Sequence, residues 1–275
     1  MTDATALPLR EVVAAVHRRY PPGTAMAWDA VGLVCGDPDQ PVRRIHLAVD
    51  PVAATVEEAL DAGADLLITH HPLLLTPLTS VAALTPHGRL LHRLVRGGCA
   101  LLAVHTNGDV ARDGVSDALA AALGVRATTP VEPDPGDPAT GLGRVGDLDE
   151  ATTLGAFAAH VRDSLPATAH GVRIAGDPER AVRRVAVIGG SGSDAIEAAA
   201  LAGADAVVTA DLKHHTAGDA LAEGGPALLD VAHWASEWPW LGLLRERLVS
   251  DLAGLGVTVD THVSTIVTDP WTARL

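Results

Sequence analysis

Two adjacent histidines, His70 and His71, close a short apolar run in the first half of the chain. The run at residues 66–69 has the length and composition of a buried strand. Pro72 restricts His71 to extended backbone geometry, so we expect the chain to turn sharply out of the strand there. In open α/β sheets ligands bind at the carboxyl ends of strands, and imidazole is the commonest metal ligand. The pair therefore predicts a site for two neighbouring metals or for one metal and a substrate, with two surface histidines as the alternative.

A second candidate pair is His105 and Asp109, which follow the apolar run at residues 100–104. We expect that run to be a strand, which would bring both side chains to the same sheet edge as His70 and His71. A carboxylate there would balance cation charge that imidazoles cannot balance. An ordinary Asx turn is the alternative interpretation.

A third pair, His233 and Glu237, follows the expected strand at residues 227–231. If Ser236 caps the next helix, Glu237 lies in its first turn and His233 stays on the loop. If the helix begins earlier, the spacing of four places both side chains on one helix face. Either geometry permits shared coordination of a metal, and the alternative is that Glu237 only complements the helix dipole.

Two further polar segments belong to the second half of the chain. Asp211, Lys213, His214 and His215 occupy its counterpart of the His70-His71 position, where they could contact a substrate or orient metal ligands. A solvated polar loop is the alternative. The glycine-rich run at residues 189–193 could receive an anion on its backbone N–H groups, although it lacks a complete dinucleotide or P-loop motif.

The elements that must position these residues alternate between strand and helix patterns. We expect strands near residues 32–35, 45–50, 66–69, 100–104, 184–188, 206–209, 227–231 and 257–260, and helices near residues 9–20, 52–62, 90–96, 154–165, 194–202 and 236–253. Such alternation predicts an α/β fold with mostly parallel sheets.

An internal repeat supports two related halves. The run Ala62-Gly63-Ala64-Asp65 recurs as Ala202-Gly203-Ala204-Asp205, each time between an expected helix and an expected strand. A common helix-to-strand turn with a glycine cap is the alternative. Because strand, helix, turn and strand recur in order, we predict two internally similar α/β lobes with a metal cleft between them.

Residues 128–149 are rich in proline, glycine and aspartate, which predicts a linker. We therefore expect a first domain made of residues 1–127 and 245–275, and a second domain made of residues 150–244.

Composition limits the classes of function. The chain has 275 residues and a formal net charge of −14, which argues against nonspecific binding to nucleic acid or to an anionic membrane. It has neither an apolar stretch long enough to cross a bilayer nor a signal-peptide pattern at its start, so we expect a cytoplasmic protein. With only Cys35 and Cys99, and no CxxC motif, any metal site must use histidine and carboxylate.

Taken together, the motifs resemble those of the Nif-three-like dinuclear metal-centre hexameric proteins, some of which carry the name GTP cyclohydrolase 1 type 2. The resemblance runs from about residue 9 to Pro270 and is highly specific because the motifs occur jointly and in order. They are Trp28-Asp29-x-Val31-Gly32-Leu33, Thr69-His70-His71-Pro72, His105-Thr106-Asn107-x-Asp109, Gly189-Gly190-Ser191-Gly192, Asp211-x-Lys213-His214-His215 and His233-x-x-x-Glu237.

The resemblance implies two interlocked α/β domains, a toroidal homohexamer, and two divalent metal ions in each subunit. The implied metal ligands are His70, His71, Asp109, His233 and Glu237, with His105 as a nearby residue that moves protons. The metals could be zinc, iron, manganese or cobalt. Two departures from the family pattern are Ala210, where glycine is usual, and Gly108, where a bulkier apolar residue is usual.

The activity that the resemblance implies is hydrolytic opening of the GTP purine ring at C8, with release of formate and formation of dihydroneopterin triphosphate. A metal pair of this kind lowers the pKa of water and polarises the substrate. We expect Asp211, Lys213, His214 and His215 to contact the substrate. Metal-dependent phosphoester hydrolysis, and a non-catalytic metal-binding scaffold or regulatory ring, are the alternatives.

Overall fold

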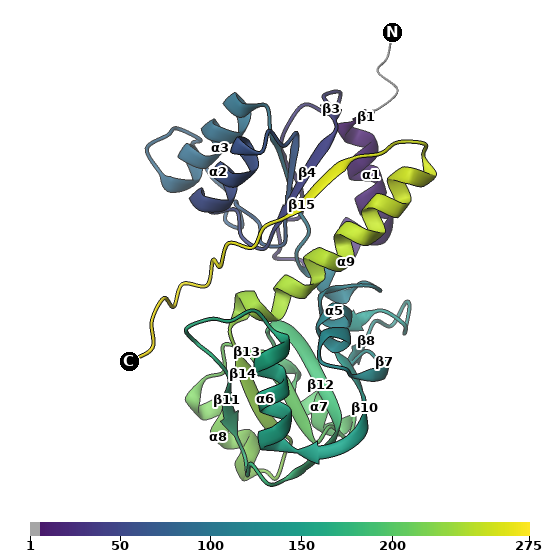
Figure 1. Cartoon of the computed structure of the whole chain (residues 1–275), viewed down its shortest axis with the longest axis vertical. Coiled ribbons are helices and arrows are strands. Elements are labelled where there is room, and N and C mark those ends of the chain that lie inside the picture. The colour runs from purple at the N-terminus through teal and green to yellow at the C-terminus, as the bar shows by residue number, and fades with distance from the viewer. Residues whose placement is uncertain (1–5) are drawn as a thin grey trace. The chain divides into compact units, whose positions relative to one another are not determined.

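The computed structural model describes residues 6–275, and the chain divides into two compact units (Figure 1). Unit 1 comprises Met1–Gly108 and Leu241–Thr268, and unit 2 comprises Asp109–Trp240 and Asp269–Leu275. Each unit is an α/β body with its own sheet, so the predicted α/β class is confirmed, with mostly parallel pairing in unit 1 and mixed pairing in unit 2.

Unit 1 contains a five-stranded sheet in the order β15-β4-β5-β6-β2. Its strands β15, β4, β5 and β6 run parallel, and β2 pairs antiparallel with β6. Helices α2 and α3 lie side by side on one face of the sheet, where they cover the aliphatic side chains of β5 and β6 (Figure 1). The bounds are β2 Gly32–Cys35, β4 Arg44–Ala48, α2 Ala53–Asp61, β5 Leu66–Thr69, α3 Pro86–Gly97, β6 Ala100–Ala103 and β15 Asp260–Val263.

Further elements complete unit 1. Helix α1 packs near the C-terminal part of α9, to which it is tied by an Arg19–Asp251 ion pair whose Nη2–Oδ1 distance is 2.7 Å. The remaining bounds are β1 Leu7–Pro8, α1 Leu9–Arg19, the 3-10 turn Pro22–Thr24, β3 Pro41–Val42, α4 Thr106–Val110 and α9 His233–Gly254. Along the chain, α4 begins in unit 1 and ends in unit 2, whereas α9 begins in unit 2 and ends in unit 1.

Unit 2 contains a six-stranded sheet in the order β11-β14-β13-β12-β10-β7. Strands β12, β13 and β14 run parallel, whereas β7, β10 and β11 are antiparallel to their neighbours. The bounds are α5 Val115–Ala122, β7 Arg126–Thr129, β8 Glu132–Pro133, β9 Gly141–Leu142, β10 Arg144–Thr153, α6 Leu154–Ser164, β11 Arg173–Ala175, β12 Ala181–Ser191, the 3-10 turn Ser193–Ala195, α7 Ile196–Leu201, β13 Ala206–Ala210, α8 His214–Ala222 and β14 Ala227–Val231.

The internal repeat performs the same structural task in both units. One carboxylate oxygen of Asp65 accepts hydrogen bonds from the backbone N–H groups of Arg43 and Arg44 at 2.7 and 2.9 Å. Asp205 accepts the corresponding bonds from Arg183 and Arg184 at 2.9 and 2.8 Å. Each aspartate thus joins the start of one parallel strand to the start of the next, which explains why the motif occurs twice.

The structure divides the chain differently from the predicted linker and domain boundaries. Residues 128–149 contribute to β7, β8, β9 and β10, so this segment is part of unit 2. Pro130, Pro135 and Pro138 lie between the strands, whereas Pro133 and Gly141 lie within the two-residue strands β8 and β9. Arg144 also forms an ion pair with Asp117 and donates to the Ala111 carbonyl at 2.8 Å, which ties the segment after Gly108 to the sheet of unit 2.

Several element boundaries also differ from the sequence-based expectation. Helix α9 begins at His233 instead of Ser236, so Ser236 is not its N-cap. Residues 214–222 form α8 where a loop was the alternative, and the last strand covers residues 260–263 instead of 257–260. Among the described residues, no helix is long and apolar enough to cross a membrane.

Candidate metal centre

Three imidazoles gather at one edge of the unit 1 sheet. His70 and His71 follow β5, and His105 follows the neighbouring parallel strand β6. Their ring centroids are 5.1 Å apart for His70 and His71, 5.2 Å for His70 and His105, and 5.4 Å for His71 and His105. One nitrogen of each ring lies within 4.8 Å of one nitrogen of each of the others. Parallel pairing of β5 and β6 therefore brings the predicted residues together, as expected for strand carboxyl ends.

Each of these rings is held through its Nδ1 atom. His70 Nδ1 lies 2.9 Å from the Val104 carbonyl oxygen, and His71 Nδ1 lies 2.7 Å from a carboxylate oxygen of Asp50. His105 Nδ1 lies 2.8 Å from a carboxylate oxygen of Asp29. Because carbonyl and carboxylate oxygens accept hydrogen bonds, the proton belongs on Nδ1 and the lone pair on Nε2. This is the arrangement that orients histidine ligands around a metal.

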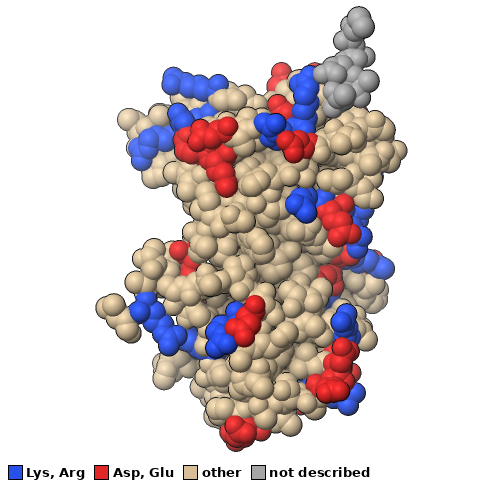
Figure 2. Space-filling view, in the orientation of Figure 1, with Lys and Arg blue, Asp and Glu red and all other residues tan. Residues whose placement is uncertain are grey.

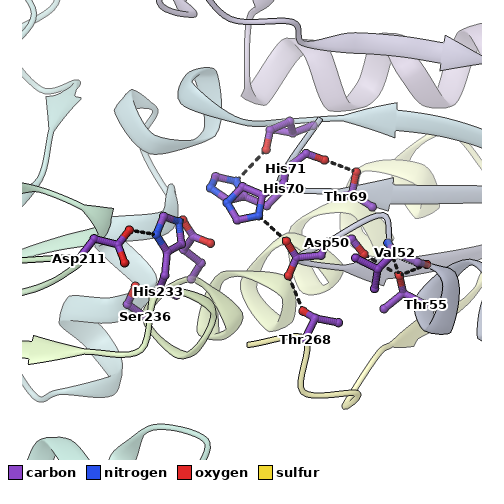
Figure 3. A network of polar contacts seen from close by, with 12 residues as sticks. Asp50, Val52, Thr55, Thr69, His70, His71, Asp211, His233, Ser236 and Thr268 are labelled. Atoms are coloured by element: carbon purple, nitrogen blue, oxygen red, sulfur yellow. Dashed lines mark hydrogen bonds and ion pairs between the residues drawn. The ribbon is translucent and has the colours of Figure 1, made fainter. Parts of the chain in front are cut away.

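The two supporting carboxylates are themselves held in place. Asp50 accepts a hydrogen bond from the Thr268 hydroxyl while it holds His71 (Figure 3). Asp29 accepts bonds from the backbone N–H and the hydroxyl of Thr106. Burial by itself raises the pKa of Asp29, but hydrogen bonds from Thr106 and His105 outweigh burial and lower that pKa. Asp29 is therefore ionised at neutral pH, as a hydrogen-bond acceptor for His105 must be.

Sequence reasoning did not assign a role to Asp29 or Asp50 in the site. Asp50 follows β4, which pairs in parallel with β5, so the rule that located His105 could also have located Asp50. Asp29 precedes the edge strand β2, and its only signal in the sequence is its place in the motif Trp28-Asp29-x-Val31-Gly32-Leu33.

His105 is neutral in this environment. Burial is the largest influence and lowers its pKa, and the nearby ring of His70 lowers it further, against the opposing effect of Asp29. A neutral imidazole can coordinate a metal or accept a proton.

Unit 2 carries a second group of ligand types. His233 and Glu237 lie one turn apart on α9, and His233 Nε2 is 2.9 Å from Glu237 Oε1. His233 Nδ1 is 2.7 Å from Asp211 Oδ2 (Figure 3). This contact agrees with the interpretation that Asp211 orients a metal ligand, here His233. The expected contact between Asp211 and a substrate stays a prediction. Asp211 has a φ of +60°, a conformation that aspartate tolerates better than most residues.

Gly190 makes room for this pair. A Cβ atom on Gly190 would lie 2.5 Å from Glu237 Oε1 and 3.1 Å from His233 Nε2. The Gly190 N–H donates to the Ser236 hydroxyl at 2.8 Å, and the Gly189 N–H donates to the Ser116 hydroxyl at 3.3 Å. These two N–H groups of the glycine-rich run therefore donate to hydroxyl groups within unit 2. Position 190 requires glycine because a side chain there would collide with Glu237 and His233.

The other predicted site residues, Asp109, Lys213, His214 and His215, lie in or next to two helices of the structure. Asp109 is in α4, at the first position of unit 2. Lys213 precedes α8, while His214 and His215 open that helix with ring centroids 5.2 Å apart. Lys213 and His214 line a shallow depression of about 410 Å³ on unit 2.

A larger cavity of about 1000 Å³ opens beside His71 in unit 1. Helix α3 and its neighbours line it with a group of cationic or titratable side chains that sequence reasoning missed, although they recur along one helix: His87, Arg89, His92, Arg93 and Arg96. Arg93 pairs with Glu57, whose Oε1 lies 2.8 Å from Arg93 Nε. Figure 2 shows that acidic and basic side chains lie close to one another at several places on the visible face.

Comparison with known proteins relates the chain to one family. A family model described as Duf34/NIF3 (NGG1p interacting factor 3) matches residues 7–270. A Streptomyces coelicolor protein named "GTP cyclohydrolase 1 type 2 homolog" is 51% identical over 271 residues, covering 97% of this chain and 94% of its own length. A Mycobacterium bovis protein of the same name is 35% identical and is matched over 96% of both chains. That match spans 369 positions against the 275 residues here, so this relative has an internal segment that the present chain lacks.

Solved structures agree with this relationship. A Bacillus cereus protein related to NIF3 superposes with a TM-score of 0.90 at 26% identity, covering 96% of this chain and 98% of that one. A Staphylococcus aureus protein gives the same TM-score at 29% identity, covering 97% and 99%. With the family model matched almost from end to end and relatives of this similarity, the chain belongs to the Duf34/NIF3 family.

Proposed function

We propose that the chain is a metal-dependent hydrolase whose two divalent ions are bound by His70, His71, Asp109, His233 and Glu237. The observation that carries the proposal is the fixing of His70 and His71 through Nδ1 by oxygen acceptors, together with the placement of the His233 ring between the carboxylates of Asp211 and Glu237. A proton held on Nδ1 places the lone pair on Nε2, which is the tautomer of a histidine that binds a metal through Nε2. Imidazole with carboxylate suits zinc, iron, manganese or cobalt, and no cysteine is needed.

The chemistry that bound divalent ions supply is polarisation of a substrate oxygen and a lowered pKa of water. The residues of the chain position that chemistry. Asp50 keeps His71 in one tautomer, and Asp211 holds the His233 ring through Nδ1. His105 is neutral, so in the proposed reaction it accepts a proton and returns it to the leaving group.

For the substrate we propose GTP, which would be opened at C8 with release of formate towards dihydroneopterin triphosphate. The names of the Streptomyces and Mycobacterium relatives support this choice. The arginines that line the cavity beside His71 support a substrate that carries phosphates. In our proposal Lys213, His214 and His215 keep their predicted role of contacting the substrate, and the first two line a depression of unit 2. The same cavity equally suits a phosphoester substrate, which is our second candidate.

The test follows formate release from GTP by the metal-loaded protein, in parallel with phosphate release from a panel of phosphoesters. Formate release supports the GTP assignment, whereas phosphate release alone replaces it with phosphoester hydrolysis. Glu237→Gln should reduce turnover by at least about 100-fold and keep the fold. Glu246→Gln, on the exposed surface of the same helix, is the matched control and should be unaffected.

A non-catalytic metal scaffold gives a different result in the same experiment. In that case no substrate is turned over, and Glu237→Gln lowers the melting temperature or disrupts the assembly instead. We also propose, on the basis of the family resemblance, that the working form is a toroidal homohexamer in the cytoplasm.

A further inference from the structure

Unit 1 contains another set of metal-ligand side chains, which shares no residue with the proposed centre. His46 on β4 and His262 on β15 face each other directly across two parallel strands, and Glu58 reaches them from α2. His46 Nε2 is 2.9 Å from Glu58 Oε2, and His262 Nε2 is 3.7 Å from Glu58 Oε1. The two rings have centroids 4.8 Å apart and are inclined by 30°. One ligand atom from each of the three residues lies within 4.8 Å of both others.

The burial of His46 is unusual for a residue without a chemical task. Its side chain is 1% exposed, on the sheet face that also carries the buried Ala48 and Leu67. An aliphatic residue at this position would avoid the desolvation of a buried imidazole. Burial lowers the pKa of His46, with Glu58 opposing that shift, so the ring is available in the neutral form that binds metals.

The set also has the composition and openness of a cation site. Two imidazoles and one carboxylate are a known ligand combination for zinc with an open fourth position. Ligand atoms around a tetrahedral zinc ion lie roughly 3.3 Å apart at bond lengths of about 2.0 Å, within the range of separations found here. The side chain of Glu58 is 25% exposed and that of His262 is 55% exposed, so solvent reaches the open side. Ser264 donates a hydrogen bond to Glu58 and helps to orient the carboxylate.

We infer that His46, Glu58 and His262 form a second divalent-cation site in unit 1, best suited to zinc. It is independent of the proposed function, because none of its ligands belongs to the proposed catalytic centre. The competing interpretation is a hydrogen-bonded trio that only joins α2 to the sheet.

The test counts metal ions per chain by equilibrium dialysis with zinc and elemental analysis, and follows Co²⁺ binding by its visible absorption. The variants are Glu58→Gln and His262→Ala, each compared with the wild-type chain. We expect each variant to bind one ion fewer per chain and to lose part of the intense absorption typical of tetrahedral Co²⁺. Gln at position 58 keeps the shape of Glu and can still hydrogen-bond to His46, so a purely structural trio predicts an unchanged metal content.

A second background separates this site from the proposed centre. In a His70→Ala, His71→Ala double variant, we expect binding of at least one Co²⁺ ion that is lost on adding His262→Ala. His160→Ala, which removes an exposed histidine of unit 2, controls for nonspecific binding and should leave the count unchanged. Equal metal content and equal Co²⁺ spectra in wild type, Glu58→Gln and His262→Ala would overturn the inference, whatever activity the protein has.

Discussion

At the scale of single residues, the histidines differ from one another mainly in what holds their Nδ1 atoms. His71 and His233 both rely on a carboxylate, Asp50 in one case and Asp211 in the other. A carboxylate acceptor raises the basicity of the ring and fixes its orientation, so it contributes to metal affinity without touching the metal.

We predict that Asp50→Asn and Asp211→Asn each weaken metal binding by about 10- to 100-fold, because an amide is a poorer acceptor and does not enforce one tautomer. The measurement is competition for zinc or Co²⁺ against a chelating dye. Asp219→Asn, an exposed substitution in α8, serves as the control. Unchanged affinity in both variants would mean that these aspartates do not support metal ligands.

Gly190 provides a second residue-scale prediction. Its φ is +67°, and an added Cβ would approach Glu237 Oε1 to 2.5 Å. Gly203 has a similar φ of +76°, but its Cβ would meet only Arg184 Cδ at 3.9 Å. Both alanine variants carry the backbone penalty of about 1 kcal/mol for a left-handed residue, and only Gly190→Ala displaces the ligand pair.

Gly190→Ala should therefore lose metal affinity and more stability than Gly203→Ala in urea unfolding. The comparison of the two variants separates backbone strain from the contact with Glu237. Equal effects of the two substitutions would show that Gly190 is required only for its backbone conformation.

His17 illustrates a stability effect of burial on a histidine outside the site. Burial lowers its pKa below the ordinary value of 6.5, and its Nε2 has no hydrogen-bond partner among the described residues. Protonation then favours the unfolded state, so this contribution to stability is complete above the unfolded pKa and is lost as the pH falls through it.

We expect His17→Gln to reduce the loss of stability between pH 7 and pH 5, measured as the free energy of unfolding in urea at several pH values. Parallel stability curves for the variant and the wild type would show that His17 titrates alike in both states.

At the scale of elements, strands with local signals were predictable and elements defined by distant partners were not. Residues 227–231 form β14 with the predicted bounds, because a run of apolar residues in a parallel sheet needs no distant partner to be recognised. Ser236 has the type of an N-cap, yet it lies within α9, where its hydroxyl donates to the His233 carbonyl and accepts from Gly190. That role depends on β12, which no local pattern around Ser236 reveals.

The predicted linker at residues 128–149 differs from the structure for a related reason. Its proline and aspartate content predicts irregular structure. In the structure, however, Arg144 at the start of β10 is buried and forms an ion pair with Asp117 of α5. Arg144 Nε and Nη2 lie 2.6 and 2.8 Å from the two carboxylate oxygens of Asp117, and Nη1 donates to the carbonyls of Gly141 and Gly143. Together with the hydrogen bond to the Ala111 carbonyl, this buried guanidinium makes five such contacts, which is typical of a packed strand and not of a linker.

This arrangement makes Arg144→Met a test of the element's role. We predict a loss of about 3–5 kcal/mol in the free energy of unfolding, because the substitution leaves carbonyls and a carboxylate without their donor. Arg126→Met, at a side chain that is 70% exposed and 3.9 Å from Asp149, should change stability by less than about 0.5 kcal/mol. Urea unfolding followed by circular dichroism measures both; similar small effects would assign residues 128–149 to a loosely attached segment.

At the scale of the whole molecule, the chain repeats one design in two units. Each unit has three consecutive parallel strands joined by helices, β4-β5-β6 in unit 1 and β12-β13-β14 in unit 2. In each unit an aspartate of the repeat joins the start of one of these strands to the start of the next. The candidate ligands follow these strands in both units: His70 and His71 follow β5, and His233 follows β14. The internal repeat therefore explains why candidate metal ligands follow parallel strands in both units.

Large apolar side chains on the surface lead to the last prediction. Trp28, Leu84, Leu201 and Trp271 are all more than half exposed in the single chain, and tryptophan is enriched in protein interfaces. If six chains of 28.2 kDa assemble into the proposed ring, the particle has a mass of about 169 kDa. Sedimentation equilibrium or light scattering on the purified full chain measures that mass directly. A mass near 28 kDa across micromolar concentrations would exclude the ring, and the metal and hydrolase proposals would then have to hold for the isolated chain.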